Sequence, residues 1–356
     1  MLQITGILIF SLIQILTPSL LNGREVELQF HEVKSVYDPD FNELKKEGFS
    51  KIIVRSFLND EFDGGLLFRN DIFKVAYPGF NKIVQQNKKR KFSLWGWLIS
   101  RNYNWLQNDI LYDSKFSKGQ RSKIRKLNLF LPVVREKVIA AFKNLAESGV
   151  EGILIQDDLS FASNEGFSDR ALHVFTEESG VPAKEKLMIK SGTPYNLRWI
   201  KIKQRIINEF LTDIVKQCKN INPNIKIGIN VYYEASIQQK KGNEWHSQDL
   251  EEIVGTGVDH IYLMMYHRQM KMELRKSKEK IKTLFRNGIH SAFKIAGDRL
   301  IVKLETWDWQ KKEIIPIKEM EEYIALIPEK VKRICFTPVK NADIKYLRQL
   351  FKAAKN

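Results

Sequence analysis

The sequence predicts a (β/α)8 barrel with enlarged loops at the C-terminal ends of its strands. Short runs of β-branched and aromatic residues alternate with helical segments across about 330 residues, as this fold requires. Acidic and aromatic side chains follow directly after several of these runs. The main alternative is a doubly wound open sheet, which normally has a glycine-rich phosphate-binding turn after an early strand. The sequence has no such turn, so the barrel is favoured.

Eight strands and two clear helices are predicted in order along the chain. The strands are expected at residues 26–31, 51–58, 92–99, 152–157, 226–232, 260–266, 300–306 and 333–337. A helix at 133–148 follows Pro132, where a missing N–H is tolerated, and stops at Gly149. A second helix at 199–218 places Ile202, Ile206 and Phe210 on one buried face.

The N-terminal segment 1–23 is predicted to be a signal peptide. Residues 2–21 contain no charged side chain, residues 7–13 are strongly apolar, and charge begins at Arg24. A retained membrane anchor is the alternative for this segment. Residues 24–356 are then expected to form a single (β/α)8 domain that is periplasmic or secreted and associates with the cell envelope.

The net charge of +16 first suggests a nucleic-acid-binding protein. However, the most basic stretches, 115–126 and 271–282, lack the interleaved aromatic residues of a single-strand binder, so no nucleic acid is expected. The two cysteines, Cys218 and Cys335, cannot form a metal cluster by themselves, and a disulfide between them stays open. Neither a metal nor another cofactor is predicted.

The predicted C-terminal rim of the barrel is rich in acidic and aromatic side chains. In a (β/α)8 barrel the chemistry takes place at this rim. Sugar rings pack their C–H faces on aromatic rings, while their hydroxyls need acids and amides, so the pattern indicates a polysaccharide ligand. The alternative is that several of the aromatics, Trp95 and Trp97 above all, pack outward beneath the helices.

The adjacent pair Asp157 and Asp158 is the sharpest feature of the rim. Two neighbouring carboxyl groups tend to separate in pKa, which leaves one protonated near neutral pH and suits acid–base catalysis. Alternatively, one of them caps a helix or binds a backbone turn. Side chains alternate between the two faces of a strand, but this alternation ends where the loop begins. It therefore does not decide which of the two residues points into the barrel mouth.

The segment 151–158, Glu-Gly-Ile-Leu-Ile-Gln-Asp-Asp, resembles the "dGIlfHDDA" segment of the C-terminal glycoside hydrolase domain of the PgaB family, glycoside hydrolase family 153. Further similar motifs recur in order over nearly the whole mature chain, on both sides of this segment. Upstream are Arg55-Ser56-Phe57 with Asp60, Gly64 and Gly65, and then 130–135. Downstream are Glu165, Asn230, Trp245 with Gln248, Lys303-Leu304 and Asp308-Trp309.

The resemblance implies a glycosidase that cleaves an extracellular amino-sugar polysaccharide, with partially deacetylated poly-β-1,6-glucosamine as the candidate substrate. Asp158 is expected to act as general acid and base and Asp157 as its partner, with Glu305 as a further candidate acid. Such a pair suits a substrate-assisted mechanism, in which the 2-acetamido oxygen is the nucleophile. The residues expected to bind sugar are Asp60, Trp97, Glu165, Asn230, Tyr232, Trp245, Tyr266 and Trp307.

The sequence also departs from the family pattern at four places. Gln156 replaces a His, Ile229 an Arg and Glu305 a Gln, and residues 265–269 lack the Pro-Tyr-Met-Glu of the sixth strand. These departures motivate a second hypothesis, a non-catalytic glycan-binding protein with the same barrel. A partly deacetylated glucosamine polymer is cationic, so a protein of charge +16 needs an acidic cleft to bind it. The acids expected to supply that field are Asp60, Glu61, Asp63, Asp157, Asp158, Glu165, Glu234 and Glu305.

Overall fold

The computed structural model describes residues 24–31, 41–49, 51–90, 92–339 and 344–355. The predicted signal peptide at 1–23 lies outside these residues. Among the helices in the described ranges, none is both long enough and apolar enough to cross a membrane. Cys218 and Cys335 are both buried and are free thiols.

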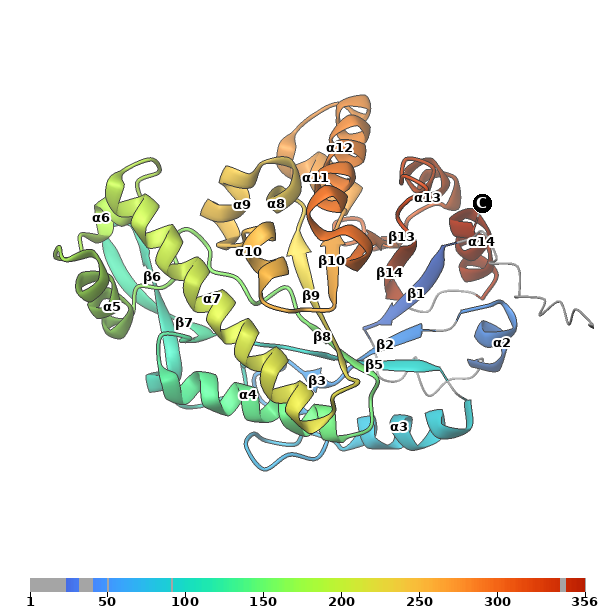
Figure 1. The fold of residues 1–356 in the computed structure, drawn as a ribbon, viewed down its shortest axis with the longest axis horizontal. Helices are drawn as coiled ribbons and strands as arrows, with labels where there is room; N and C mark the ends of the chain where they lie inside the picture. Colours follow the sequence, from blue (N-terminus) through green and yellow to red (C-terminus); the bar gives the residue numbers. More distant parts are fainter. Residues whose placement is uncertain (1–23, 32–40, 50, 91, 340–343, 356) are drawn as a thin grey trace, which may run out of the picture.

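Eight parallel strands form a closed barrel, which confirms the predicted fold (Figure 1). The strands follow one another around the barrel in chain order, and the last one, β14, pairs with β1. They are β1 (Glu25–Phe30), β2 (Lys51–Arg55), β5 (Ser93–Leu98), β8 (Gly152–Ile155), β9 (Lys226–Tyr232), β10 (His260–Met264), β11 (Leu300–Glu305) and β14 (Arg333–Val339).

The observed strands agree with the prediction except at their ends. Strand β2 stops at Arg55, because the chain turns away there and forms a separate antiparallel pair, β3 (Phe57–Leu58) with β4 (Gly65–Leu66). Strand β8 ends at Ile155, so the Asp157–Asp158 pair lies in the loop that follows. Two further short pairs lie outside the barrel, β6 (Tyr112–Ser117) with β7 (Gln120–Leu127), and β12 (Trp307–Asp308) with β13 (Glu313–Ile314).

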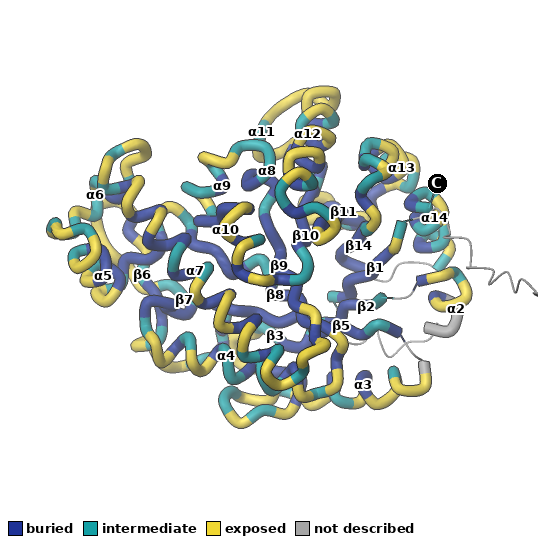
Figure 2. Tube along the Cα trace, in the orientation of Figure 1, coloured by how far each residue is buried: buried dark blue, intermediate teal, exposed yellow. Residues whose placement is uncertain are grey.

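Helices surround the barrel, and their inner faces are buried while their outer faces are exposed (Figure 2). The two predicted helices are α4 (Pro132–Glu147) and α7 (Pro194–Ile221), which pack against each other. The others are α2 (Phe41–Lys46), α3 (Gly79–Arg90), α5 (Asp169–Ser179), α6 (Glu185–Met188), α8 (Glu234–Ile237), α9 (Gln239–His246), α10 (Leu250–Gly255), α11 (His267–Leu274), α12 (Lys278–Ala296), α13 (Ile317–Ile324) and α14 (Ile344–Lys355).

The enlarged loops after β5 and β8 extend the molecule at one end. The β6–β7 hairpin comes from the first loop, and α5 and α6 come from the second, and together they project beyond the barrel (left in Figure 1). The basic stretch 115–126 forms this hairpin.

The barrel interior accommodates two large rings because neighbouring strands carry glycine at the same level. Trp95 on β5 packs over Gly152 on β8 and near Gly228 on β9, and Tyr262 on β10 also packs on Gly228. Trp97, two residues beyond Trp95 on the same strand, points to the same side. Neither tryptophan therefore packs outward beneath the helices.

We predict that Gly152→Ala destabilises the protein by about 1 to 3 kcal/mol, the usual range for overpacking a filled core. A Cβ atom at this position would lie 2.2 Å from the Trp95 ring. Gly255→Ala is the matched control, because a Cβ at this helix end meets nothing within 4 Å. Urea unfolding of the two variants measures the difference, and equal stabilities would contradict this account of the barrel interior.

Candidate active site

A cavity of about 320 Å³ opens at the mouth of the barrel, and every barrel strand or the residue directly after it contributes to its wall. This placement at the C-terminal ends of the strands is the usual position of the active site in this fold. We call it the mouth cavity. Its walls consist of Gln29, His31, Arg55, Trp97, Gln156, Asp157, Asn230, Met264, Tyr266, Gln269, Lys303, Trp309, Thr337 and Pro338.

Among the described residues of the wall of the mouth cavity, the carboxylate is that of Asp157. Burial raises the pKa of this carboxyl group, and the positive charge of Lys303 opposes that shift. A raised pKa keeps a larger fraction of the group protonated near neutral pH, which is the state that a proton donor needs.

Asp158 has a different position, because its carboxylate is turned toward the end of β5. It accepts hydrogen bonds from the backbone N–H groups of Ser100 (3.0 Å), Arg101 (2.7 Å) and Asn102 (2.7 Å), and from the Ser100 hydroxyl (2.8 Å). The residue is buried and does not line the mouth cavity. Of the two predicted acids, the structure thus brings Asp157 to the cavity and uses Asp158 to hold the loop after β5.

Lys303 and Asn230 form a polar contact across the barrel mouth. The Lys303 ammonium donates to Asn230 Oδ1 at 2.6 Å, and Asn230 Nδ2 donates to the Ile155 carbonyl at 2.8 Å. Burial lowers the pKa of Lys303 to about 8, while Asp157 acts in the opposite direction. Asn230 was predicted to bind sugar, and the structure places it in the cavity wall beside this lysine.

Several polar atoms in the cavity wall have no partner among the described residues, although they are buried. They are the two amide atoms of Gln29, Trp97 Nε1, Arg55 Nε and Gln156 Oε1. A buried polar atom without a hydrogen bond is unfavourable, so such atoms are usually satisfied by a ligand or by water. The mouth cavity therefore suits a ligand rich in hydroxyl or amide groups.

Aromatic rings form one side of the mouth cavity. The His31 ring lies 4.5 Å from the Trp97 ring and 5.9 Å from the Trp309 ring, measured between centroids. Trp97 is buried, whereas 47% of Trp309 is exposed. An indole that is half exposed at the edge of a polar cavity provides an apolar surface on which a sugar ring packs. Tyr266, predicted to bind sugar, also belongs to the cavity wall.

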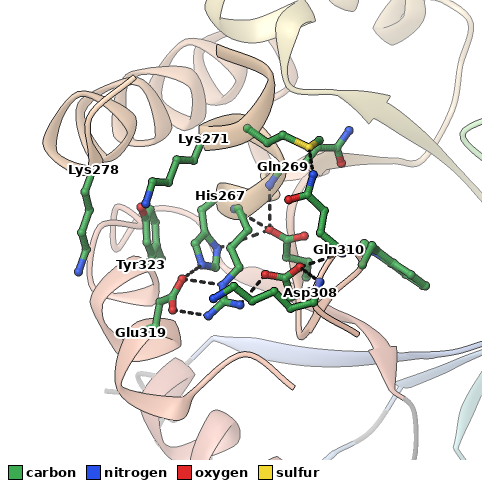
Figure 3. Close-up of a pocket in the computed structure, with 13 residues that line it drawn as sticks. His267, Gln269, Lys271, Lys278, Asp308, Gln310, Glu319 and Tyr323 are labelled. Carbon is green, nitrogen blue, oxygen red and sulfur yellow. Dashed lines mark hydrogen bonds and ion pairs between the residues drawn. The ribbon is translucent and has the colours of Figure 1, made fainter. Parts of the chain in front are cut away.

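A second cavity of about 680 Å³ adjoins the first, since Gln269 and Trp309 line both (Figure 3). Arg268 lies in its wall and forms ion pairs with Asp308 (2.6 Å) and Glu319 (2.7 Å). His267 Nε2 lies 2.8 Å from Glu319 Oε1. The segment that departs from the family pattern at 265–269 thus supplies a charged network that joins α11 to β12 and α13.

Glu305 lies at the end of β11 in the wall of the adjoining cavity. One carboxylate oxygen accepts the backbone N–H groups of Arg268 (2.7 Å) and Gln269 (3.4 Å), so Glu305 caps the N-terminus of α11. Burial raises the pKa of Glu305 to about 7 despite these hydrogen bonds. This group was predicted as a candidate acid, and the structure separates it from the wall of the mouth cavity.

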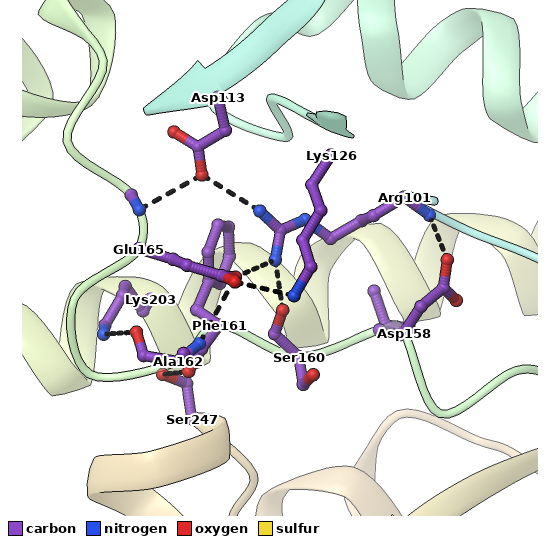
Figure 4. Close-up of polar contacts among 12 residues, drawn as sticks. Arg101, Asp113, Lys126, Asp158, Ser160, Phe161, Ala162, Glu165, Lys203 and Ser247 are labelled. Carbon is purple, nitrogen blue, oxygen red and sulfur yellow. Dashed lines mark hydrogen bonds and ion pairs between the residues drawn. The ribbon is translucent and has the colours of Figure 1, made fainter. Parts of the chain in front are cut away.

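Glu165 belongs to a buried ion-pair network that lies outside the mouth cavity (Figure 4). Its carboxylate contacts Arg101 at 3.0 Å and Lys126 at 2.6 Å, and Arg101 also pairs with Asp113 at 2.9 Å. The Arg101 guanidinium additionally donates to the Ser160 carbonyl. These contacts hold the β8 loop against the loop after β5, and Glu165 is not in the wall of the mouth cavity.

The other predicted sugar contacts lie outside the walls of the two cavities. Asp60 caps a surface turn through the N–H groups of residues 62 and 63. Tyr232 stacks on His246 at 3.8 Å. Trp245 is 40% exposed on α9, where the Lys241 ammonium lies over its ring, and Trp307 is on the short strand β12. The structure therefore brings together Asp157, Trp97, Asn230 and Tyr266 from the predicted set.

Gln29, His31 and Arg55 are wall residues outside the set predicted to catalyse or to bind sugar, although Arg55 belongs to the family-like motif at 55–65. A signal existed for Gln29, since polar and apolar residues alternate along β1, which places Gln29 on the same face as Glu27. Among the described residues, no group of three or more His, Cys, Asp or Glu side chains is arranged to hold a metal ion.

Residues 41–336 match the model of a family described as hypothetical glycosyl hydrolase family 13. The chain belongs to this family. A search of curated protein sequences gives no match. The residues matched by the family model span most of the barrel and include Asp157 and Asp158.

Three solved structures with a similar fold are a glycoside hydrolase domain, a β-galactosidase and a mannanase. The glycoside hydrolase domain of PgaB (BpsB) from Bordetella bronchiseptica has a TM-score of 0.73 and 17% identity, over 92% of this chain and 98% of that one. A cold-adapted β-galactosidase from Rahnella sp. R3 has a TM-score of 0.65 and 12% identity, over 94% of this chain and 56% of that one. An endo-β-1,4-mannanase from Thermotoga petrophila has a TM-score of 0.55 and 9% identity, over 95% and 79%. At these identities the likeness establishes the fold.

We predict that Asp158→Asn lowers the free energy of unfolding by about 2 to 4 kcal/mol, because a charged acceptor of several hydrogen bonds is lost. Asp157→Asn is the matched control, and we expect it to change stability by no more than about 1 kcal/mol. Urea unfolding near neutral pH measures both. Equal losses in the two variants would contradict the different positions of the two carboxylates.

We also predict that Glu305→Gln changes the pH dependence of stability. Since the pKa of Glu305 is raised from 4.5 to about 7, its stabilising contribution is complete below pH 4.5 and is lost as the pH rises through 7. Glutamine keeps the acceptor oxygen and does not titrate. The variant should therefore gain about 2 kcal/mol relative to the wild type between pH 5 and pH 8. The prediction would be wrong if the free energies of unfolding of the variant and the wild type differ by the same amount at pH 5 and at pH 8.

Proposed function

We propose that this protein is an exported glycosidase that hydrolyses an amino-sugar polysaccharide, with Asp157 as the proton donor. The observation that carries the proposal is the position of Asp157, a carboxylic acid of raised pKa in the wall of the mouth cavity. Membership of a glycosyl hydrolase family supports it, as do the unpaired polar atoms and the half-exposed Trp309 of the same cavity.

A substrate-assisted route fits the wall of the mouth cavity best. Among the described residues that line it there is one carboxyl group, whereas direct displacement uses two carboxyl groups that flank the glycosidic bond. In the assisted route the 2-acetamido oxygen attacks the anomeric carbon while Asp157 protonates the leaving oxygen. Water then attacks the anomeric carbon of the cyclic intermediate and returns a proton to Asp157, so the acid is regenerated.

Asp158 has a positioning role in this proposal. Its hydrogen bonds to residues 100–102 fix the loop after β5 next to the loop that carries Asp157. The adjoining cavity extends the mouth cavity past Trp309 and provides room for further sugar units of a polymer. Poly-β-1,6-glucosamine remains the candidate polymer from the family resemblance, and the cell envelope the candidate location.

A non-catalytic glycan-binding protein is the second candidate. The observation that favours it is that the described part of the cavity wall has a single carboxyl group, beside Gln156 where the resembled family has a His. Such a protein would bind amino-sugar oligomers in the mouth cavity and release no reducing ends at any pH.

We predict that Asp157→Asn reduces the release of reducing ends from the best of a panel of defined amino-sugar polymers by at least about 100-fold. Oligosaccharide binding should persist, because asparagine preserves the size of the side chain. Asp213→Asn, an exposed position on α7, is the matched control and should leave the rate unchanged. Mass analysis of the products identifies the substrate. If the wild type binds these polymers but cleaves none of them, the binding protein is the correct alternative.

We further predict that Lys303→Met shifts the high-pH side of the rate profile to higher pH. The Lys303 charge lowers the pKa of Asp157, so its removal lets burial raise that pKa further. Since the proton donor must be protonated, activity is lost as the pH rises through this pKa. A profile of kcat against pH for the wild type and the variant measures the shift. If the high-pH side of the variant's profile stays in place or moves to lower pH, Asp157 is not the acid.

A further inference from the structure

Arg55 is an arginine at the barrel mouth for which the described residues provide no hydrogen bond to the guanidinium and no ion pair. It ends strand β2 and lines the mouth cavity. Its guanidinium carbon lies 4.5 Å from the Phe57 ring centre and 5.6 Å from that of Trp97. The two ring centres lie only 5.3 Å from each other, so both rings pack on the same side of the guanidinium. Its Nε is buried without a partner among the described residues, which leaves the N–H edge for a ligand.

Two other arginines at the same rim, the fully buried Arg101 and the partly buried Arg268, both have carboxylate partners. Arg101 pairs with Asp113 and Glu165, and Arg268 pairs with Asp308 and Glu319. The pKa of Arg268 is raised by its partners, whereas burial lowers the pKa of Arg55. Arginine remains charged at physiological pH even so, and a partly buried positive charge without a counter-ion is unfavourable.

The charges around the mouth cavity favour an anionic ligand. Of the described residues in the wall, Arg55 and Lys303 are the cationic ones apart from His31, and Asp157 carries the carboxyl group. When Asp157 is protonated for catalysis, the wall is left with positive charge. Four of the eight acids expected to create an acidic cleft have other partners. Asp158 accepts hydrogen bonds from the loop after β5, and Glu305 accepts them from the start of α11. Glu165 forms an ion pair with Arg101, and Glu61 forms one with Arg125.

We propose that Arg55 forms a subsite for the carboxylate of an acidic sugar, so that the substrate carries uronic acid or similarly carboxylated units beside its N-acetylated amino sugars. The planar guanidinium presents paired N–H donors that match the two oxygens of a carboxylate. Gln29, buried in the same wall with both amide atoms unpaired, supplies further hydrogen bonds to the same unit. The inference rests on the proposed function, in that the mouth cavity is the glycan site.

An acidic substrate would take the place of the cationic polymer that the family resemblance suggests, and it would remove the conflict of charge with this protein. A chain of net charge +16 attracts an acidic polysaccharide and repels a deacetylated glucosamine polymer. The acetamido group required by the assisted mechanism remains available, because alternating N-acetylhexosamine and uronic acid units provide both groups.

The test uses the full chain and three oligosaccharides of equal length in calorimetric titrations. One alternates N-acetylglucosamine with glucuronic acid, one is the same compound with its carboxyl groups reduced to alcohols, and one is fully deacetylated β-1,6-glucosamine. We expect the acidic compound to bind at least 10-fold more tightly than the reduced one, and the glucosamine oligomer to bind most weakly.

Substitutions of Arg55 then assign the preference to this side chain. Arg55→Gln should weaken binding of the acidic compound at least 10-fold and leave binding of the reduced compound unchanged. Arg55→Lys keeps the charge without the paired donors and should show an intermediate loss, and it also serves if the glutamine variant does not fold. Arg286→Gln, at an exposed position on α12, removes the same charge elsewhere and should alter neither affinity.

The outcomes separate this inference from the proposed function. Equal binding of the acidic and reduced compounds, with both cleaved, overturns the carboxylate subsite and leaves the glycosidase intact. Equal losses for both compounds in Arg55→Gln also overturn it. A preference for the acidic compound that depends on Arg55, without release of reducing ends, supports the subsite and overturns the glycosidase. If none of the three compounds binds, both are overturned.

Discussion

The hydrogen bonds that Asp158 accepts from three successive backbone N–H groups after β5 determine the geometry of the barrel mouth. They join the ends of β5 and β8, two neighbouring strands, at the point where the chain leaves the barrel. With Asp158 turned toward β5, the preceding residue Asp157 faces the cavity. The long loops then pack on this joint, since Arg101, whose N–H is one of the donors, also anchors Glu165 and Asp113 through its side chain.

Near this joint, side chains that point into the barrel are polar, whereas side chains that point outward from the strands are apolar. Lys303 and Asn230 point inward from β11 and β9 and contact each other within reach of Asp157. Ile229, the neighbour of Asn230, is completely buried and points to the opposite side of the strand. Its departure from the family pattern therefore leaves the polarity of the mouth cavity unchanged. Gln156 is the departure that does line the cavity, where it replaces a titratable side chain with a neutral one.

The sequence was sufficient to predict all eight strands and the barrel, because β-branched runs, glycine stops and helical periodicity agree along the chain. It also predicted that Asp157, Trp97, Asn230 and Tyr266 meet, since parallel strands end at one rim. It could not separate Asp157 from Asp158, because both lie beyond the last residue of β8, where alternation no longer applies. Nor could it show that Glu165 is an ion-pair partner, since Arg101 and Lys126 reach it only through tertiary packing.

The three rim arginines distinguish structural charges from a charge kept for a ligand. Arg101 and Arg268 each neutralise carboxylates from other segments, so each joins parts of the chain that are distant in sequence. Arg55 contacts only aromatic faces and makes no such connection among the described residues. A guanidinium that stabilises no tertiary contact, yet is partly buried beside Gln29 and Trp97, is unfavourable for folding. Function accounts for its presence better than stability does, because active sites are where proteins retain unfavourable charges that a ligand later compensates.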